Sequence, residues 1–315
     1  MDKIIVNVSS YGRIDSLEKT IKSIYNQCDV INVALNDNHN NIPLFLYDTK
    51  INLFLTDNSL GDAFKFMCLT SCESGYFLTI DDDLIYPPDY VEYMIGKCKE
   101  YNNTKVITLH GRNFSKFPIE SYYRSATERY SCLGLVKHDV KVQFGGTGVM
   151  CFHTNLMRIP LNYFQQPNMA DVWVGKYCIE NNVEVTCVRH TKGYINYTHQ
   201  LETIYDTHSR SDRTQTLVVN SIYDKTIKLD FSVIPQEVEV TIEPEKPKEA
   251  PKEEAIVIKP TIEKTQKMIN YEKVNQIFNR TPSHTSIKPK NVGSSSSLKT
   301  NASVLQKLNK NKGRR

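Results

Sequence analysis

The chain has 315 residues, 40% of them hydrophobic, and its 39 Lys and Arg residues against 35 Asp and Glu residues give a formal net charge of +4. This apolar content is enough for a globular core, which excludes a wholly disordered protein. No apolar run reaches the roughly 18 residues that a membrane-spanning helix needs, and no signal peptide pattern precedes the first strand-like segment. We therefore expect a cytoplasmic protein with no transmembrane segment, and its 8 cysteines as reduced thiols.

The charge is distributed unevenly along the chain. Residues 1–235 hold 26 acidic and 23 basic residues, whereas residues 236–315 hold 9 acidic and 16 basic residues. Within the second part, residues 236–254 are rich in Glu and Pro, and residues 255–315 hold 13 basic residues against 2 acidic ones. Such a composition buries too little surface to offset the cost of ordering the chain. We predict one globular domain over residues 1–235 and a disordered charged tail over residues 236–315.

Strand-like and helix-like segments alternate along the first 110 residues. Such an alternation predicts an α/β fold with a mostly parallel sheet and helices on both of its faces. Further along, residues 170–182 have the pattern of a helix, residues 183–188 that of a strand, and residues 199–227 that of a loop followed by a helix. The early strand-like segments are residues 4–10, 30–35, 51–56, 76–80 and 105–111, and the helix-like segments between them are residues 16–27, 61–72 and 89–101.

Polar side chains follow four of the predicted strands at their carboxyl ends. They are Ser9 and Ser10, Asp37, Asp57, and the run Asp81, Asp82 and Asp83. Ligands of parallel α/β sheets bind just beyond these ends, so we expect the side chains to lie along one edge. Three adjacent carboxylates at the end of a buried strand are costly unless a cation neutralises them. Oxygen ligands of this kind suit Mg²⁺ or Mn²⁺ bound together with substrate phosphates.

Six segments in this order resemble the family-2-type glycosyltransferases of GT-A fold, across roughly residues 3–230. Each segment is short, but their common order and spacing make the resemblance specific. The resemblance implies a Rossmann-like mostly parallel sheet that binds a nucleotide-sugar donor. The segments are IIVNVSSYGRIDSLEKTIKSIYNQ, INVALND, LTDNSLGDAFKF, GYFLTIDDDLIYPPDYVEYM, FGGTGVMCFHT and MADVWVGKYC.

On the donor side, the resemblance implies that Asp81 and Asp83 form a D-x-D pair. This pair would bind Mn²⁺ or Mg²⁺ on the donor diphosphate, with His199 as a third metal ligand and His208 as the alternative. The other donor-binding residues that it implies are Ser9 and Ser10 in the base pocket, Asp37 at the uracil ring, Asp57 and Lys65 near the nucleotide, Arg13 near the phosphates, and Asp82 at the ribose or the sugar.

On the acceptor side, the resemblance implies that Asp171 is the general base that takes the proton of the acceptor hydroxyl. An inverting transfer needs such a base on the face opposite the leaving diphosphate. Gly146, in a glycine-rich segment, would let the backbone approach the acceptor, and Trp173 would either stack on the acceptor sugar or belong to the core.

The activity implied is metal-dependent, inverting transfer of a sugar from a nucleotide donor, with UDP expected, to a glycan or another hydroxyl acceptor. One alternative is a protein that binds nucleic acid or an anionic membrane surface through its basic tail, since residues 255–315 carry a salt-sensitive positive charge. A peripheral position at a membrane surface would fit the same tail. Another alternative is a nucleotidyltransferase on a related fold, although SSYGRID has fewer glycines than the phosphate loop of those enzymes needs.

Overall fold

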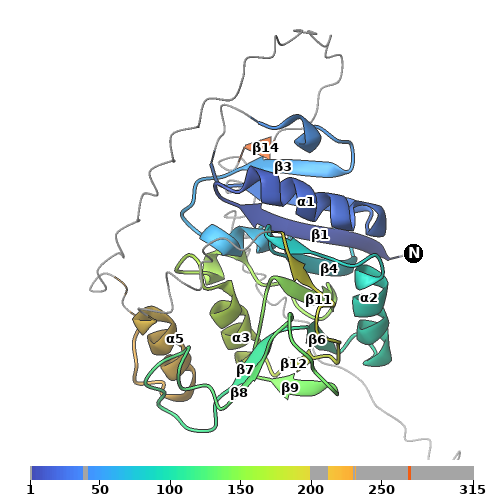
Figure 1. Cartoon of the computed structure of the whole chain (residues 1–315). Helices are drawn as coiled ribbons and strands as arrows, with labels where there is room; N and C mark the ends of the chain where they lie inside the picture. Colours follow the sequence, from blue (N-terminus) through green and yellow to red (C-terminus); the bar gives the residue numbers. More distant parts are fainter. Residues whose placement is uncertain (1, 38–41, 199–211, 230, 232–268, 271–315) are drawn as a thin grey trace, which may run out of the picture. The chain divides into compact units, whose positions relative to one another are not determined.

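The computed structural model describes residues 2–37, 42–198, 212–229, 231 and 269–270 (Figure 1). The chain divides into two units, Met1–Asn275 and Gln276–Arg315, and the second lies wholly outside the described residues. The predicted domain end at residue 235 therefore remains a prediction. No helix in the described part of the chain is long and apolar enough to cross a membrane.

A nine-stranded sheet forms the centre of the first unit (Figure 1). Its strands from β14 to β4 are all parallel, β11 is antiparallel to both of its neighbours, β12 is parallel to β6, and β9 is antiparallel to β12. The predicted mostly parallel sheet is therefore confirmed. In spatial order the strands are β14 (Ile269–Asn270), β3 (Ile51–Leu55), β2 (Val30–Leu35), β1 (Lys3–Ser10), β4 (Gly75–Ile80), β11 (Val149–His153), β6 (Lys105–Thr108), β12 (Glu184–Cys187) and β9 (Val140–Val142).

Helices cover both faces of this sheet, as predicted. One face packs against α1 (Ile14–Ile24) and α2 (Tyr90–Glu100), and the other packs against α3 (Ala170–Glu180), beside which α5 (Arg213–Tyr223) packs. The strands supply apolar side chains to both faces, which gives two hydrophobic clusters. Residues 61–72, predicted as a helix, form only the short 3₁₀ helix η3 (Gly61–Phe66) followed by turns.

Three short 3₁₀ helices and two small sheets complete the described elements. One small sheet contains β10, β7 and β8, and the other pairs β13 with β5. The remaining elements are η1 (Tyr25–Gln27), η2 (Leu44–Leu46), β5 (Leu84–Ile85), β7 (Gly111–Asn113), β8 (Glu128–Tyr130), β10 (Phe144–Gly145), η4 (Leu161–Tyr163) and β13 (Asn196–Tyr197).

A row of asparagines crosses the parallel strands beneath the site. Asn32 donates from Nδ2 to Asn7 Oδ1 at 2.7 Å, and Asn52 donates from Nδ2 to Asn32 Oδ1 at 2.9 Å. Asn7 in turn donates to the carbonyl oxygen of Leu78 at 2.9 Å. These asparagines stand at paired positions of β1, β2 and β3. Because buried amides need partners, the row favours this one register of the strands.

The order of the strands places the site beyond the carboxyl ends of the neighbouring strands β1 and β4. The chain passes from β1 to β2 and β3 on one side and then returns to β4 on the other side. The loops that leave β1 and β4 therefore diverge, and the crevice between them is the usual ligand-binding position of such sheets. β1 ends at Ser10, and β4 ends directly before Asp81.

Candidate active site

The loops after β1 and β4 meet through charged side chains. Ser10 donates a hydrogen bond from Oγ to Asp82 Oδ2 at 2.7 Å. Arg13, directly before α1, donates from Nη1 to Asp82 Oδ1 at 3.2 Å and to Asp83 Oδ2 at 2.7 Å. The structure thus brings together four of the residues predicted for the donor side and the metal.

The carboxylates of this group are only partly neutralised. Burial raises the pKa of Asp82 to about 6, although Arg13 and the hydrogen bond from Ser10 favour the charged form. Burial also raises the pKa of Asp83, and the negative charge of Asp81 raises it further. Although burial opposes its charge, Arg13 has a raised pKa because it faces Asp82 and Asp83. Excess negative charge in a buried place favours the binding of a further cation.

Lys65 pairs with the first aspartate of the run. Its side chain is only 3% exposed, and its ammonium group forms an ion pair with Asp81 Oδ1. Although burial opposes its charge, the carboxylates of Asp81 and Asp62 raise the pKa of Lys65. Lys65 lies in η3, the short 3₁₀ helix that forms in place of the predicted helix. This element places the cation beside Asp81, Asp82 and Asp83, which we call the acid cluster.

Asp62 is an acidic residue of the site that the sequence did not single out. Its carboxylate accepts a hydrogen bond from the Ala170 backbone N–H at 3.1 Å, so it caps the first turn of α3. Burial raises the pKa of Asp62 to about 7; Lys65 opposes this rise, and the charge of Asp171 adds to it. Its only signal in the sequence is its place in GDAFKF, three residues before Lys65.

This raised pKa predicts an unusual pH dependence of stability. An Asp has a pKa of about 4 when unfolded, so the folded chain binds the proton of Asp62 more tightly between about pH 4 and 7. Its contribution to stability is therefore fully present below pH 4 and is lost as the pH rises toward 7. Asp62→Asn keeps an acceptor for Ala170 and should stabilise the protein, relative to wild type, by about 2 kcal/mol more at pH 8 than at pH 5.

Urea unfolding at the two pH values measures this difference. Asp224→Asn is the control: hydrogen bonds from Thr226 lower the pKa of Asp224, so this carboxylate is ionised in the folded and the unfolded chain at both pH values, and its removal should change stability equally at pH 5 and pH 8. A difference between Asp62→Asn and wild type that does not change with pH would contradict the protonated Asp62.

A tyrosine and a glycine hold Asp81 from the other side. The backbone N–H of Asp81 donates to the Tyr86 hydroxyl at 2.9 Å, and this hydroxyl donates to the Gly148 carbonyl oxygen at 2.6 Å. A Cβ atom on Gly148 would lie 1.9 Å from Asp81 Oδ2 and 2.4 Å from Asp81 Cγ. The glycine is therefore needed for the close approach of the carboxylate to this backbone.

Gly148→Ala should consequently displace the Asp81 carboxylate and weaken its ion pair with Lys65. We expect a loss of about 1–3 kcal/mol in the free energy of unfolding, as for other overpacked sites. Gly96→Ala is the matched control, because nothing lies within 4 Å of a Cβ at this position of α2, where Ala should stabilise the helix by about 0.5–1 kcal/mol. Equal stability of the two variants in urea would show that Gly148 does not constrain Asp81.

The predicted general base lies beside this glycine. Asp171, in the first turn of α3, accepts hydrogen bonds at Oδ1 from the backbone N–H and from the hydroxyl of Thr147, both at 2.7 Å. Thr147 and Gly148 are neighbours in sequence, so one dipeptide contacts Asp171 on one side and Asp81 on the other. The hydrogen-bonding side chain of Thr147 was missed, although it stands in the FGGTG segment that the sequence had marked.

A half-buried histidine, His110, lies beside the glycine segment. Gly146 donates its N–H to the His110 carbonyl oxygen at 2.9 Å, and a Cβ on Gly146 would lie 3.1 Å from His110 Cγ. Burial lowers the pKa of His110, although the charge of Asp171 opposes this. The imidazole is therefore neutral near pH 7 and lies against the glycine segment that precedes Thr147. His110 stands in the predicted strand KVITLHG, but nothing there marked it as functional.

The remaining predicted residues divide between the site edge and the core. Asp37 accepts a hydrogen bond at Oδ2 from the Gly12 N–H at 2.7 Å; Gly12 has a φ of +70°, which favours glycine there. Ser9 is buried at the end of β1, whereas Asp57 is exposed and accepts hydrogen bonds from Ser59. The structure places Trp173 in the hydrophobic core with 1% exposure, so it has no open face for an acceptor sugar.

The metal site remains a prediction. Among the described residues, no three His, Cys, Asp or Glu side chains are grouped so that they could hold a metal ion. The predicted third ligand, His199, and its alternative, His208, lie outside those residues. The carboxylate oxygens of Asp81 and Asp83 suit Mg²⁺ or Mn²⁺, and phosphate oxygens of a donor would have to supply further ligands.

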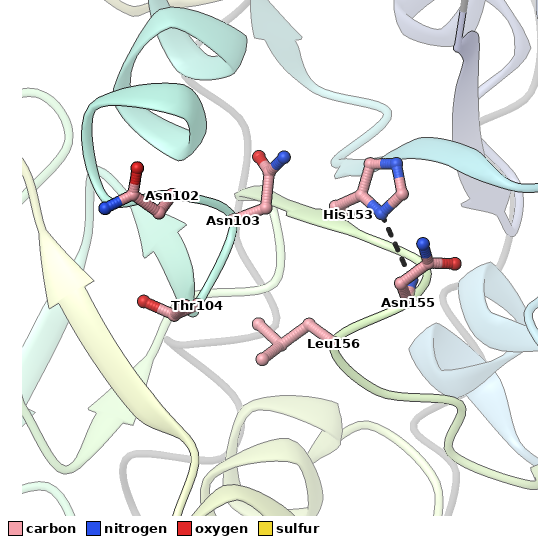
Figure 2. A pocket seen from close by; sticks show the side chains of 6 residues that line it. All are labelled: Asn102, Asn103, Thr104, His153, Asn155 and Leu156. Atoms are coloured by element: carbon pink, nitrogen blue, oxygen red, sulfur yellow. Dashed lines mark hydrogen bonds between the residues drawn. The ribbon is translucent and has the colours of Figure 1, made fainter. Parts of the chain in front are cut away.

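A cavity of about 460 Å³ lies elsewhere, at the opposite edge of the sheet (Figure 2). It is formed where α2 ends, where β6 begins and where β11 ends, and inside it the Asn155 N–H donates to His153 Nδ1 at 3.2 Å. None of the predicted site residues lines it. Its lining residues are Asn102, Asn103, Thr104, His153, Asn155 and Leu156.

Solved structures similar to this chain include three of S. aureus TarS. TarS 1-349 in complex with UDP-GlcNAc has a TM-score of 0.44 and 11% sequence identity, with 72% of this chain and 68% of that chain covered. TarS 1-349 has a TM-score of 0.39 and 12% identity over 74% of this chain and 75% of that chain. A third structure, of TarS, has a TM-score of 0.40 and 12% identity, with 72% of this chain and 40% of that chain covered.

No family model and no curated protein matches the chain. At these TM-scores and identities the similarity to TarS carries no functional argument.

Proposed function

We propose that this protein is a glycosyltransferase that moves a sugar from a nucleotide donor, with UDP expected, to the hydroxyl of an acceptor. The observation that carries the proposal is the Thr147–Gly148 dipeptide. It places a hydrogen-bonded carboxylate, Asp171, next to the acid cluster that ends in Asp83. A transfer of this kind needs an acceptor base on one side and a phosphate-binding site on the other.

On the acceptor side, Asp171 has the arrangement of a general base. Both hydrogen bonds that it accepts reach Oδ1, and the described residues donate none to Oδ2. Oδ2 is therefore the oxygen that takes the proton of the acceptor hydroxyl. The acceptor oxygen then forms a bond to the anomeric carbon of the sugar, and the bond from that carbon to the diphosphate breaks. The nucleoside diphosphate leaves with the electron pair of that bond, and the configuration at the anomeric carbon inverts.

On the donor side, the cluster holds the diphosphate through charge. Asp81 and Asp83 are the residues that would hold a Mg²⁺ or Mn²⁺ ion, and such an ion stabilises the charge that develops on a leaving diphosphate. Lys65 forms an ion pair with Asp81, and Arg13 fixes Asp82 and Asp83 at the loop between β1 and α1. Ser10 and Asp37 lie at the ends of β1 and β2, where the base and the ribose of the donor would bind.

A donor screen tests the proposal. The melting temperature of the full chain is measured with Mn²⁺ and, in turn, with UDP-, GDP- and ADP-sugars at 1 mM. One donor at about 100 times its Kd should stabilise the folded state by about 2.7 kcal/mol. Asp82→Asn should abolish the shift, and Asp224→Asn, a carboxylate of an exposed turn, should preserve it. No shift with any donor, and no release of nucleoside diphosphate, would contradict the proposal.

A further inference from the structure

Arg112 in β7 is a buried cation. Arg112 is only 9% exposed. Its Nη1 donates a hydrogen bond to the Tyr122 carbonyl oxygen at 3.3 Å, and its Cζ lies 4.3 and 5.1 Å from the ring centroids of Tyr122 and Tyr123. No carboxylate of the described residues forms an ion pair with it. In contrast, Lys65 and Lys97, the two buried lysines among the described residues, both have carboxylate partners.

A second arginine faces the first across the strand pair. Arg112 in β7 stands directly opposite Arg129 in β8 in the antiparallel register. Arg129 is exposed, and its Nη2 donates to the carbonyl oxygens of Tyr123 and Arg124 at 2.9 Å. Like charges at directly opposed positions destabilise a sheet. The nearest acid on β8, Glu128, accepts instead from Asn113, at the neighbouring opposed pair.

The Arg112 side chain lies on the face of its sheet that is turned toward α3. Arg112 is paired with Phe144 of β10, and opposed side chains of antiparallel strands share a face. Phe144 contacts α3, because a Cβ on Gly175 would lie 2.3 Å from Phe144 Cδ1. The same strand β10 leads directly into Gly146 and Thr147, which holds Asp171.

Electrostatics agrees with this placement. Burial raises the pKa of Tyr123 to about 12; the charge of Asp171 raises it further, and Arg112 opposes the rise. The same two charges act in the same directions on Tyr122. Arg112 and Asp171 therefore both lie close enough to Tyr122 and Tyr123 to act on them electrostatically.

We infer that Arg112 and Arg129 form an anion-binding subsite on the acceptor side, and that the acceptor carries a phosphate or carboxylate group next to the hydroxyl that reacts. A guanidinium that is buried without a counter-charge costs free energy, and a planar oxyanion or a phosphate supplies both the charge and the acceptors that it lacks. The description of this anion as part of the acceptor rests on the proposed function. The anion site itself does not.

The test measures the binding of inorganic phosphate to the full chain by calorimetry at constant ionic strength, with UDP and Mg²⁺ present to fill the donor site. Arg112→Gln and Arg129→Gln should each weaken phosphate binding by about tenfold or more, the loss expected for one charge-assisted hydrogen bond. Lys116→Gln, at an exposed position of the same region, is the control and should bind phosphate as wild type does. Arg129 is exposed, so its variant keeps the test valid even if Arg112→Gln does not fold.

Equal phosphate affinities in wild type and in all three variants would overturn the subsite. A second series compares glucose with glucose 6-phosphate and glucuronate, which separates phosphate from carboxylate as the preferred group; a preference for neutral glucose would also overturn the inference. Failure of UDP to bind in the same titrations would instead count against the proposed function, so the two failures can be told apart.

Discussion

Asp171→Asn should lower the rate of sugar transfer by about 10²–10⁴-fold, the usual contribution of a general base. The amide oxygen of Asn can still accept the two hydrogen bonds that Thr147 donates to Oδ1. The amide nitrogen then replaces Oδ2, and it cannot take a proton from the acceptor. The variant should therefore keep its melting temperature and its affinity for the donor while transfer, measured as product formed per minute, is lost.

Thr147→Val gives a graded comparison. This variant removes the hydroxyl donor but keeps the backbone N–H donor to Asp171, so transfer should fall less than in Asp171→Asn. Asp224→Asn, far along the chain in an exposed turn, should transfer at the rate of wild type. Full activity of Asp171→Asn would exclude Asp171 as the base and would direct attention to His110, the neutral imidazole on the same side.

The sequence predicted the parallel half of the sheet well, because its signals are local. Apolar runs followed by polar residues located β1, β2 and β4 to within one residue, and helical spacing located α2 and α3. The acid cluster directly follows β4, so the order of the elements predicted that charged side chains gather at the carboxyl edge of the sheet. Residues 61–72 were misjudged because their apolar residues recur at helical spacing, whereas the chain forms only a 3₁₀ turn there.

The parts of the site that the sequence did not predict depend on contacts between distant segments. The cap that Asp62 makes on α3 joins residues 108 positions apart, and no local pattern marks it. The burial of Arg112, with no ion pair to a carboxylate in the described part of the chain, likewise follows from contacts that no local pattern indicates. Trp173 had two interpretations in the sequence, a sugar platform or a core residue, and burial among Tyr163 and Phe231 places it in the core. Burial and pairing of charges are properties of the assembled fold.

Lys65→Met should lower the free energy of unfolding by about 3 kcal/mol and should also weaken donor binding. Removal of one partner of a buried ion pair leaves the other charge without compensation, which usually costs 3–5 kcal/mol, and the partial exposure of Asp81 places the cost at the lower end. Asp62 and Asp81 both lose the cation that stabilises their charge. Urea unfolding measures the first effect, and calorimetric titration with the nucleotide sugar measures the second.

Lys97→Met separates these two effects. Lys97 is also buried and pairs with Asp139 and Glu100 at 2.8 Å, but it lies on α2, away from the acid cluster. Its loss should destabilise the protein to a similar degree without changing the affinity for the donor. Weak donor binding in both variants would mean that stability alone accounts for the effect of Lys65.

The cost of Lys65→Met should also depend on pH. The pKa of Asp62 is about 7 even with Lys65 in place, and loss of this cation raises that pKa further. At pH 5 Asp62 is then protonated and needs no counter-charge, whereas at pH 8 the buried carboxylate must either bind a proton at a cost or remain charged without a partner. The destabilisation by Lys65→Met should therefore be smaller at pH 5 than at pH 8. The double variant with Asp62→Asn should lose this pH dependence, because the group that titrates is gone; a pH dependence that persists would exclude Asp62 as its origin.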